Sequence, residues 1–410
     1  MKKFILLLIL GMLSSLGLSG CSIAQSFMPT ATPTITPTPQ PTATPLPPTP
    51  TPTPTEIPFY IDATVIPVDQ QVPILIYHRF VPEYMDANSM HMRYSEFKNE
   101  LQTFYDNDFV LVSLYDWIKG TYIVPPGKRP LIISIDDMWY ADQLFINEDG
   151  TPSDLSALGI LYEFSQQHPD FGYHAAVFAI YGDKYYAEKQ IGDRFIVSDN
   201  ATWTTSSWHI KLGNTIAWAL EHGIEVYNHT LNHYNLTNLD NSEIQHQLEE
   251  NDLVMRQFLT EAGQADWIPS LQNIIALPEG KWPANQSGKN TILNYINPEG
   301  EPVLAVMEAY NLDAAQFTPS YFSPEFNPFA IARITASPYF VNYIVANKDQ
   351  IPLAERCQLG PVKQELVGDQ VVLQELVSNA VLSGTCPEGV YHIGDWIFVA
   401  QDGTVTLHQP

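Results

Sequence analysis

The chain has 410 residues, of which 45 are Asp or Glu and 19 are Lys or Arg, so its formal net charge is −26. This acidity argues against binding to nucleic acid or to an anionic membrane surface. The part of the chain beyond residue 58 is long enough to bury a sizeable core, as one large domain with room for a small one.

The N-terminal residues have the pattern of a bacterial lipoprotein signal. Lys2 and Lys3 precede an apolar run from Phe4 to Leu13, and Leu18-Ser19-Gly20-Cys21 resembles a lipobox. We expect removal of residues 1–20 and lipidation of Cys21; a plain signal peptide with an incidental cysteine is the alternative. The apolar run is too short to span a bilayer. The mature chain is therefore expected outside the cytoplasm, anchored to the membrane by lipid.

The segment that follows, residues 21–58, begins with Cys21 and consists mostly of Thr and Pro from Pro29 onward. Such a composition cannot form a packed core, and it favours an extended polyproline-type conformation. We interpret residues 21–58 as a tether that holds the folded part away from the membrane.

Apolar runs that indicate buried strands alternate with helical patterns over residues 59–350. The predicted strands are 73–78, 131–137, 175–180, 224–229, 273–277 and 329–335. The predicted helices are 95–106, 154–168, 214–222 and one that begins after Asp240, where Glu243 completes the pattern of a capping box. Alternating strands and helices favour parallel strands with helical crossovers, and hence an α/β fold, either a barrel or an open sheet.

The pattern changes in the last part of the chain, residues 351–410. Residues 371–373, 391–400 and 404–407 read as short strands, and Gln401-Asp402-Gly403 as a hairpin turn. We therefore expect a small β-rich appendage at the C-terminus. Cys357 and Cys386 form an even pair in an oxidising compartment, which favours a disulfide. Two free thiols are the alternative.

Two motifs place metal-binding chemistry at the ends of predicted strands. The carboxylate pair Asp136-Asp137 ends one strand, and His229 and His233 follow another. One carboxylate and two imidazoles can hold a divalent metal with positions left open, and the second carboxylate can then act as a base. Taken singly, an Asp-Asp pair is more often a solvated turn, and such histidines are more often surface or core residues. It is the combination that predicts a site.

The order of these motifs resembles the polysaccharide deacetylases of carbohydrate esterase family 4, over residues 70 to 345. The first strand, Val72 to His78, is similar to that of the family, and Ser134 to Met138 stands in place of Thr-Phe-Asp-Asp-Gly. Residues 229–233 match the histidine motif of the family. Leu277 to Gly280 resembles its Pro-Tyr-Gly turn, and residues 327–334 resemble a late strand.

The resemblance implies a fold, a cofactor and a role for each site residue. The fold is a distorted (β/α) barrel of about seven strands. Asp136 would be the catalytic base, and Asp137, His229 and His233 the ligands of a divalent metal, zinc first and cobalt as another option. The backbone N–H of Glu279 would help to hold the oxyanion.

Three features depart from the family pattern. Met138 replaces a glycine, Ala276 stands where many members carry an arginine that orients the base, and we find no Leu-x-His to serve as general acid. We interpret His78 as a structural histidine near the barrel opening, and Arg333 as a structural ion-pair partner.

The leading hypothesis is a lipid-anchored, metal-dependent hydrolase that removes N-acetyl groups from a cell-envelope or extracellular polysaccharide. Two alternatives remain open. One is a carbohydrate-binding or wall-interaction lipoprotein on a barrel that has lost catalysis. The other is an O-acetyl esterase that uses the same site, because an ester has a better leaving group and needs less help from a general acid.

Overall fold

The computed structural model describes residues 58–88, 90–137, 142–182, 206–309 and 317–409, with the side chains of residues 206–208 excepted. The signal, Cys21, nearly all of the predicted tether, and Met138 lie outside the described residues. Residues 57–410 form one compact unit. None of the helices in the described ranges combines the length and the apolar character that crossing a bilayer requires.

Seven parallel strands form the central sheet, in the order β11-β10-β9-β8-β7-β3-β13. Their bounds are β3 Ile74–Tyr77, β7 Arg129–Asp136, β8 Ala175–Ala179, β9 Ile224–Asn228, β10 Ile274–Ala276, β11 Ala305–Met307 and β13 Ile334–Thr335. A parallel bridge joins Met307 of β11 to Ile331, three residues before β13, so one short segment contacts both edges of the sheet. The distorted (β/α) barrel of about seven strands is therefore confirmed.

Alternation along the strands separates the inside of the barrel from the outside. Ile132 of β7 packs in a cluster with Phe178 and Tyr227, inside the barrel, whereas Ile133 packs with the residues of the surrounding helices. All eight residues of β7 are buried, because its two faces are both covered. By the same alternation, Ser134 and Asp136 face the inside. We call the end at which the parallel strands terminate the mouth.

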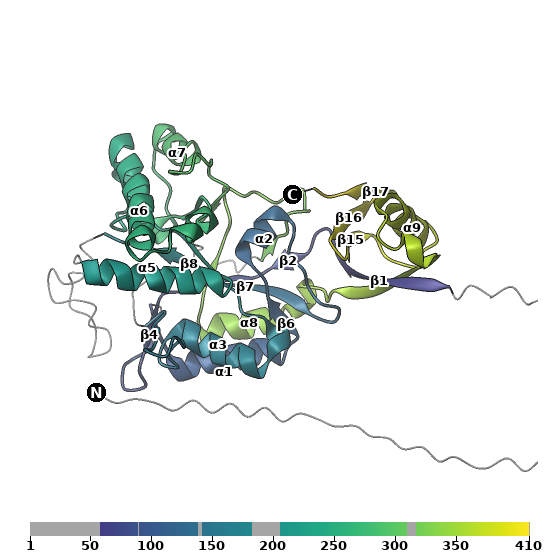
Figure 1. Ribbon diagram of the computed structural model, residues 1–410, viewed down its shortest axis with the longest axis horizontal. Coiled ribbons are helices and arrows are strands. Elements are labelled where there is room, and N and C mark those ends of the chain that lie inside the picture. Colours follow the sequence, from purple (N-terminus) through teal and green to yellow (C-terminus); the bar gives the residue numbers. More distant parts are fainter. Residues whose placement is uncertain (1–57, 89, 138–141, 183–205, 310–316, 410) are drawn as a thin grey trace, which may run out of the picture. The chain divides into compact units, whose positions relative to one another are not determined.

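Helices cover the outer face of the sheet (Figure 1). One group contains α1 Tyr94–Tyr105, α3 Ala157–Gln167 and α8 Pro338–Ala346, and the other contains α5 Ser206–Glu221, α6 Asn241–Glu261 and α7 Gln286–Leu293. The cap predicted for α6 is present, since the carboxylate of Asp240 accepts a hydrogen bond of 2.9 Å from the backbone N–H of Glu243. Helix α5 begins at Ser206, eight residues earlier than the sequence pattern indicated.

Shorter elements complete the barrel region. They are α2 Leu114–Lys119 and the strands β2 Gln71–Val72, β4 Arg79–Val81, β5 His91–Arg93, β6 Phe109–Leu111 and β12 Thr318–Pro319. Strand β6 pairs with the first residues of β7, whereas β4 pairs with β5 and β12 with β2 in separate two-stranded sheets.

The C-terminal region is a second sheet with the order β14-β1-β15-β16-β17. Its strands are β14 Glu355–Val362, β1 Phe59–Ile66, β15 Gly389–Ile393, β16 Trp396–Gln401 and β17 Thr404–Leu407. Strand β1 belongs here, although we placed residues 59–66 in the barrel region 59–350. It pairs with both β14 and β15, and pairing between segments about 300 residues apart leaves no local signal in the sequence.

The strand predicted at residues 371–373 is wrong, because these residues lie in α9 Gln370–Leu382. The β-branched pair Val371-Val372 suggested a strand. However, the carboxylate of Asp369 accepts hydrogen bonds from the backbone N–H groups of both valines and so begins a helix. Leu373 and Val377 then bury one face of α9 against the sheet.

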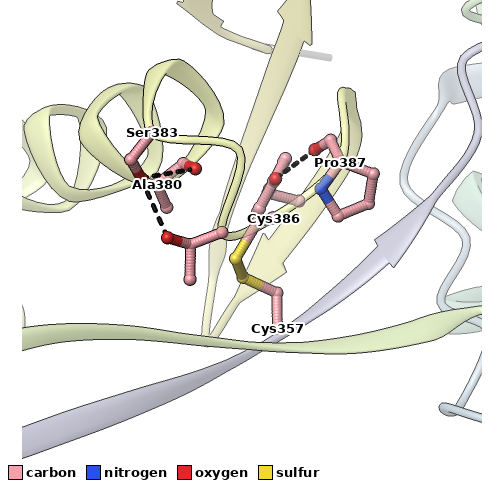
Figure 2. The surroundings of a disulfide bond; sticks show 7 residues. Cys357, Ala380, Ser383, Cys386 and Pro387 are labelled. Atoms are coloured by element: carbon pink, nitrogen blue, oxygen red, sulfur yellow. Dashed lines mark hydrogen bonds between the residues drawn. A yellow bond between two sulfur atoms is a disulfide. The ribbon is translucent and has the colours of Figure 1, made fainter.

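A disulfide joins Cys357 to Cys386, with their Cα atoms 5.8 Å apart, so the predicted pairing is confirmed (Figure 2). Cys357 lies on β14, and Cys386 follows α9. The bond therefore connects the edge strand of the C-terminal sheet to the segment that leaves its helix.

Candidate metal centre and catalytic base

The candidate site residues gather at the mouth because the strands that carry them run parallel. Asp136 is the last residue of β7, and His229 directly follows β9. Asp137 and His233 have positive φ angles, 66° and 51°. Such angles turn the chain sharply away from a strand, and non-glycine residues adopt them uncommonly. The sharp turns come directly before the positions at which the two side chains meet, Oδ1 of Asp137 and Nε2 of His233 being 3.6 Å apart.

Asp137, His229 and His233 form one cluster. A carboxylate oxygen of Asp137 and one ring nitrogen of each histidine all lie within 4.8 Å of one another. Oδ1 of Asp137 is 3.5 Å from Nε2 of His229 and 3.6 Å from Nε2 of His233. A cation placed between these three atoms could contact all of them after small shifts.

The hydrogen bonds around the cluster fit a metal ion. Nδ1 of His229 lies 2.8 Å from the backbone oxygen of Ala276, so the ring donates from Nδ1 and keeps the lone pair of Nε2 for the cluster. Burial lowers the pKa of His229, which favours the neutral form that binds metals. Oδ1 of Asp137 is buried and has no hydrogen-bond partner among the described residues. Two imidazoles and one carboxylate are a common ligand set for zinc.

Asp136 is held by Arg333 and borders the cluster, with its Oδ2 3.6 Å from Nε2 of His229. Nη1 and Nη2 of Arg333 donate to the two carboxylate oxygens of Asp136 at 2.6 and 2.9 Å. Arg333 is wholly buried; its Nη1 also donates to Oγ of Ser134 at 3.1 Å, and its guanidinium lies 4.9 Å from the centre of the Phe178 ring. Burial alone would raise the pKa of Asp136, but Arg333 and, to a lesser extent, His229 lower it to about 2. Asp136 is therefore a carboxylate at neutral pH.

Position 276 is an alanine, and the arginine that contacts Asp136 is Arg333. The interpretation of Arg333 as an ion-pair partner is confirmed, but the sequence did not reveal that its partner is Asp136. The two residues come from β7 and from the segment just before β13, which meet only once the barrel has formed. In the sequence, Arg333 lies two residues after Ile331 in a strand-like run, so the two side chains are predicted to point to the same face. That spacing does not identify the partner of Arg333. Ala276 has a different role, since its backbone oxygen fixes the ring of His229.

Glu279 lies on a tight turn beside the cluster. Its φ is 55°, and its side chain accepts hydrogen bonds from Asn235 Nδ2 at 2.6 Å and Lys281 Nζ at 2.7 Å. The bond from Lys281 is the largest cause that lowers the pKa of Glu279. The bond from Asn235, two residues after His233, places the turn near the cluster. The carboxylate of Glu279 is thus engaged by Asn235 and Lys281 rather than by the cluster. The role predicted for its backbone N–H in holding an oxyanion stays a prediction.

Close packing holds this turn in place. Gly280, the next residue, has a φ of 63°, and a Cβ atom there would lie 2.2 Å from the backbone nitrogen of Ala309. Only glycine therefore allows the turn to pack against the end of β11.

Comparison with known families identifies part of this arrangement. The polysaccharide deacetylase family model matches residues 187–286, a stretch that contains both histidines of the cluster and the Glu279 turn. The resemblance drawn from the motifs is thereby confirmed. The two aspartates lie outside the matched stretch. No curated protein sequence matches the chain.

Several solved structures are similar to the chain at low sequence identity. Streptococcus pyogenes deacetylase PplD in complex with acetate is 15% identical, with a TM-score of 0.43, over 69% of this chain and 98% of that protein. IcaB from Ammonifex degensii is 15% identical, with a TM-score of 0.40, over 68% and 96%. A polysaccharide deacetylase from Bacillus cereus is 13% identical, with a TM-score of 0.42, over 68% and 69%.

Proposed function

We propose that this chain, a member of the polysaccharide deacetylase family, is a metal-dependent hydrolase that removes N-acetyl groups from a cell-envelope or extracellular polysaccharide. The observation that carries the proposal is the separation of two tasks at the mouth. Asp137, His229 and His233 form a cluster suited to a metal. Asp136 borders this cluster, 3.6 Å from Nε2 of His229, and both of its oxygens are held by Arg333.

Each residue then has a chemical task. A divalent ion bound by the cluster would act as a Lewis acid on the acetyl carbonyl and make water more acidic. Asp136 takes the proton of the attacking water, and Arg333 keeps its two oxygens in a fixed orientation. The backbone N–H of Glu279 donates a hydrogen bond to the oxyanion that develops. Acetate and a free amine on the sugar are the products.

The ion pair also bears on the non-catalytic alternative. Three features motivated the idea of a glycan-binding protein on an inactive barrel: Met138, the absence of an arginine at position 276 and the missing general acid. Arg333 orients the base from the segment just before β13, which answers the second of these motives and favours the enzyme.

A direct test is the release of acetate by residues 56–410, loaded with zinc or cobalt, from N-acetylglucosamine oligomers and from peptidoglycan. Asp137→Ala should lose both metal and activity. Asp136→Asn should bind metal in the same stoichiometry as the parent and yet release no acetate. If the loaded parent leaves every N-acetylated glycan unchanged but cleaves O-acetyl groups, the esterase alternative is correct.

We further propose that the enzyme acts outside the cytoplasm, anchored by lipid at Cys21. The support is the basic, apolar and lipobox order of residues 2–21. In a bacterial host, the full chain should fractionate with membranes, and Cys21→Ala should move it to the soluble or secreted fraction. An unchanged membrane fraction for Cys21→Ala would contradict lipid anchoring.

A further inference from the structure

The peptide group between Asp136 and Asp137 joins the candidate base to a candidate metal ligand. Its oxygen, the backbone oxygen of Asp136, accepts a hydrogen bond of 2.7 Å from Nε2 of Gln143. The same nitrogen carries a second hydrogen and donates to the backbone oxygen of His78 at 2.6 Å. His78 directly follows β3 and is the neighbour of Asp136 one step beyond the last pair in the register of β3 with β7. One amide group therefore holds the ends of both strands.

Gln143 makes these bonds from a firmly held position. Its side chain is fully buried. Its backbone oxygen and that of Asp142 each accept a hydrogen bond of 2.9 Å from one of the first two backbone N–H groups of α3. The carboxylate of Asp142 accepts hydrogen bonds from Nε of Arg79 at 2.8 Å and from the backbone N–H of Phe80 at 3.0 Å. The amide of Gln143 is thus fixed to α3 and to β4, and it can hold the strand ends in place.

The orientation of the peptide group affects the position of the Asp137 carboxylate. Asp137 has a φ of 66°, a value that a residue with a Cβ atom adopts at a cost in free energy. This angle describes the rotation of Asp137 relative to the peptide group before it. If that group were free to turn, the strained φ could relax. Oδ1 of Asp137 would then lose its alignment with Nε2 of His229 and Nε2 of His233, which lie 3.5 and 3.6 Å away.

Side-chain contacts hold the base but do not account for the position of Asp137. Arg333 contacts the side-chain oxygens of Asp136 and not its peptide oxygen. Oδ1 of Asp137 is buried and has no hydrogen-bond partner among the residues that the structure describes. The position of this carboxylate therefore depends on the backbone next to it, and Gln143 holds that backbone.

We propose that Gln143 is a positioning residue for the metal cluster, an inference that rests on the proposed metal-dependent function. By holding the peptide oxygen of Asp136, its amide keeps the carboxylate of Asp137 aligned with the two histidines. Gln143 acts through the backbone, whereas Arg333 acts on the base directly. Residues that orient metal ligands in this indirect way typically change metal affinity or activity by about 10- to 100-fold.

The test uses cobalt, because the visible absorption of a bound cobalt ion depends on the arrangement of its ligands. The full chain and its Gln143→Met variant, which has an apolar side chain of similar size, are titrated with cobalt and with zinc. We expect Gln143→Met to bind zinc about 10- to 100-fold more weakly and to give shifted cobalt bands. At saturating zinc, its release of acetate from an N-acetylglucosamine oligomer should fall by about tenfold or more.

Gln70→Met is the matched control. Gln70 is also fully buried, and its Nε2 donates to the backbone oxygen of Gln71 on β2. Strand β2 precedes β3, so this glutamine lies near the start of β3, whereas Gln143 holds its end. Gln70→Met should unfold at a lower denaturant concentration and keep the cobalt spectrum and zinc affinity of the parent. Equal spectral shifts in the two variants would overturn the inference, because they would reflect a general loss of packing.

A second variant, Gln143→Asn, serves if Gln143→Met does not fold. It retains an amide, but its side chain is one methylene shorter and cannot reach both oxygens from the same backbone position. It should shift the cobalt bands in the same direction by a smaller amount. A folded Gln143 variant with the spectrum, zinc affinity and activity of the parent would overturn the inference and leave the function intact.

The same measurements separate the inference from the proposed function. If the spectra differ as expected but the zinc-loaded parent deacetylates no glycan, the positioning role is supported and the function is contradicted. A parent that binds neither cobalt nor zinc would overturn both.

Discussion

Arg333 and Asp136, 197 residues apart in the chain, form a buried ion pair in which two guanidinium nitrogens contact the two oxygens of one carboxylate. The pair links the end of β7 to the segment before β13, with only β3 between these two strands in the sheet. It fixes the orientation of the candidate catalytic carboxylate in a chain that has alanine at position 276.

Replacement of Arg333 by Met should raise the pKa of Asp136. Burial raises this pKa, and Arg333 is the main cause that opposes it, so the acidic limb of the rate profile should move to higher pH. Removing one partner of a buried pair should also lower the free energy of unfolding by about 3–5 kcal/mol. The measurements are kcat/KM against pH and denaturant unfolding.

Arg256→Met is the matched control for this change. Arg256 is buried and contacts the buried Asp252 and the more exposed Glu299 on the α6 side of the barrel. Its loss should lower stability without moving the acidic limb. An identical shift of the limb in both variants would contradict the role given to Arg333.

Gly280→Ala should disrupt the turn beside the metal cluster. Its new Cβ would lie 2.2 Å from the backbone nitrogen of Ala309, and backbone atoms cannot move aside cheaply. We expect at least a tenfold loss of kcat, measured as acetate release. Gly263→Ala has a comparable positive φ, 72°, but open space around the new atom. That variant should lose about 1 kcal/mol of stability and retain its activity, and equal loss of activity in both would contradict the packing argument.

Glu100 should make the protein less stable as the pH rises. Burial raises the pKa of Glu100 to about 7 from 4.5, and the hydrogen bond from Tyr77 offsets this only in part. Because the folded state holds this proton more tightly than the unfolded chain, the contribution of Glu100 to stability is greatest below about pH 4.5 and falls between pH 4.5 and 7. Urea midpoints measured across this range should fall less in Glu100→Gln. An unchanged slope in this variant would mean that other groups cause the dependence.

Loss of the disulfide should weaken the C-terminal sheet and spare the metal centre. Cys357 and Cys386 are 29 residues apart, and opening a loop of that size costs about 3.5 kcal/mol in the chain-entropy model. The double variant Cys357→Ser and Cys386→Ser should unfold at lower denaturant concentration and bind zinc in the same stoichiometry. Treatment of the parent with a reductant should reproduce the shift. If the reductant leaves the unfolding midpoint of the parent unchanged while the double variant is destabilised, the serine side chains, and not the loss of the disulfide, cause the destabilisation.

Features that depend on neighbouring residues were predictable from the sequence. The buried run that ends in Asp136, the histidine pair after β9 and the cap at Asp240 all follow from periodicity and from short-range bonds. The helix at residues 370–382 was not predicted, because two valines favour a strand and the capping aspartate before them was given too little weight. In the structure, Leu373 and Val377 pack against the sheet and stabilise the helix.

By itself, the sequence determined which side chains end the strands, because the alternation of apolar residues along a strand is a local pattern. It therefore determined which kind of chemistry the mouth could hold. The tertiary structure alone decided which distant residues complete the site. It placed Arg333 against Asp136, His78 next to the same carboxylate, and residues 59–66 in the C-terminal sheet. These contacts arise from closure of the barrel and from strand pairing over long separations, and a residue carries no local record of a partner that lies some 200 residues away.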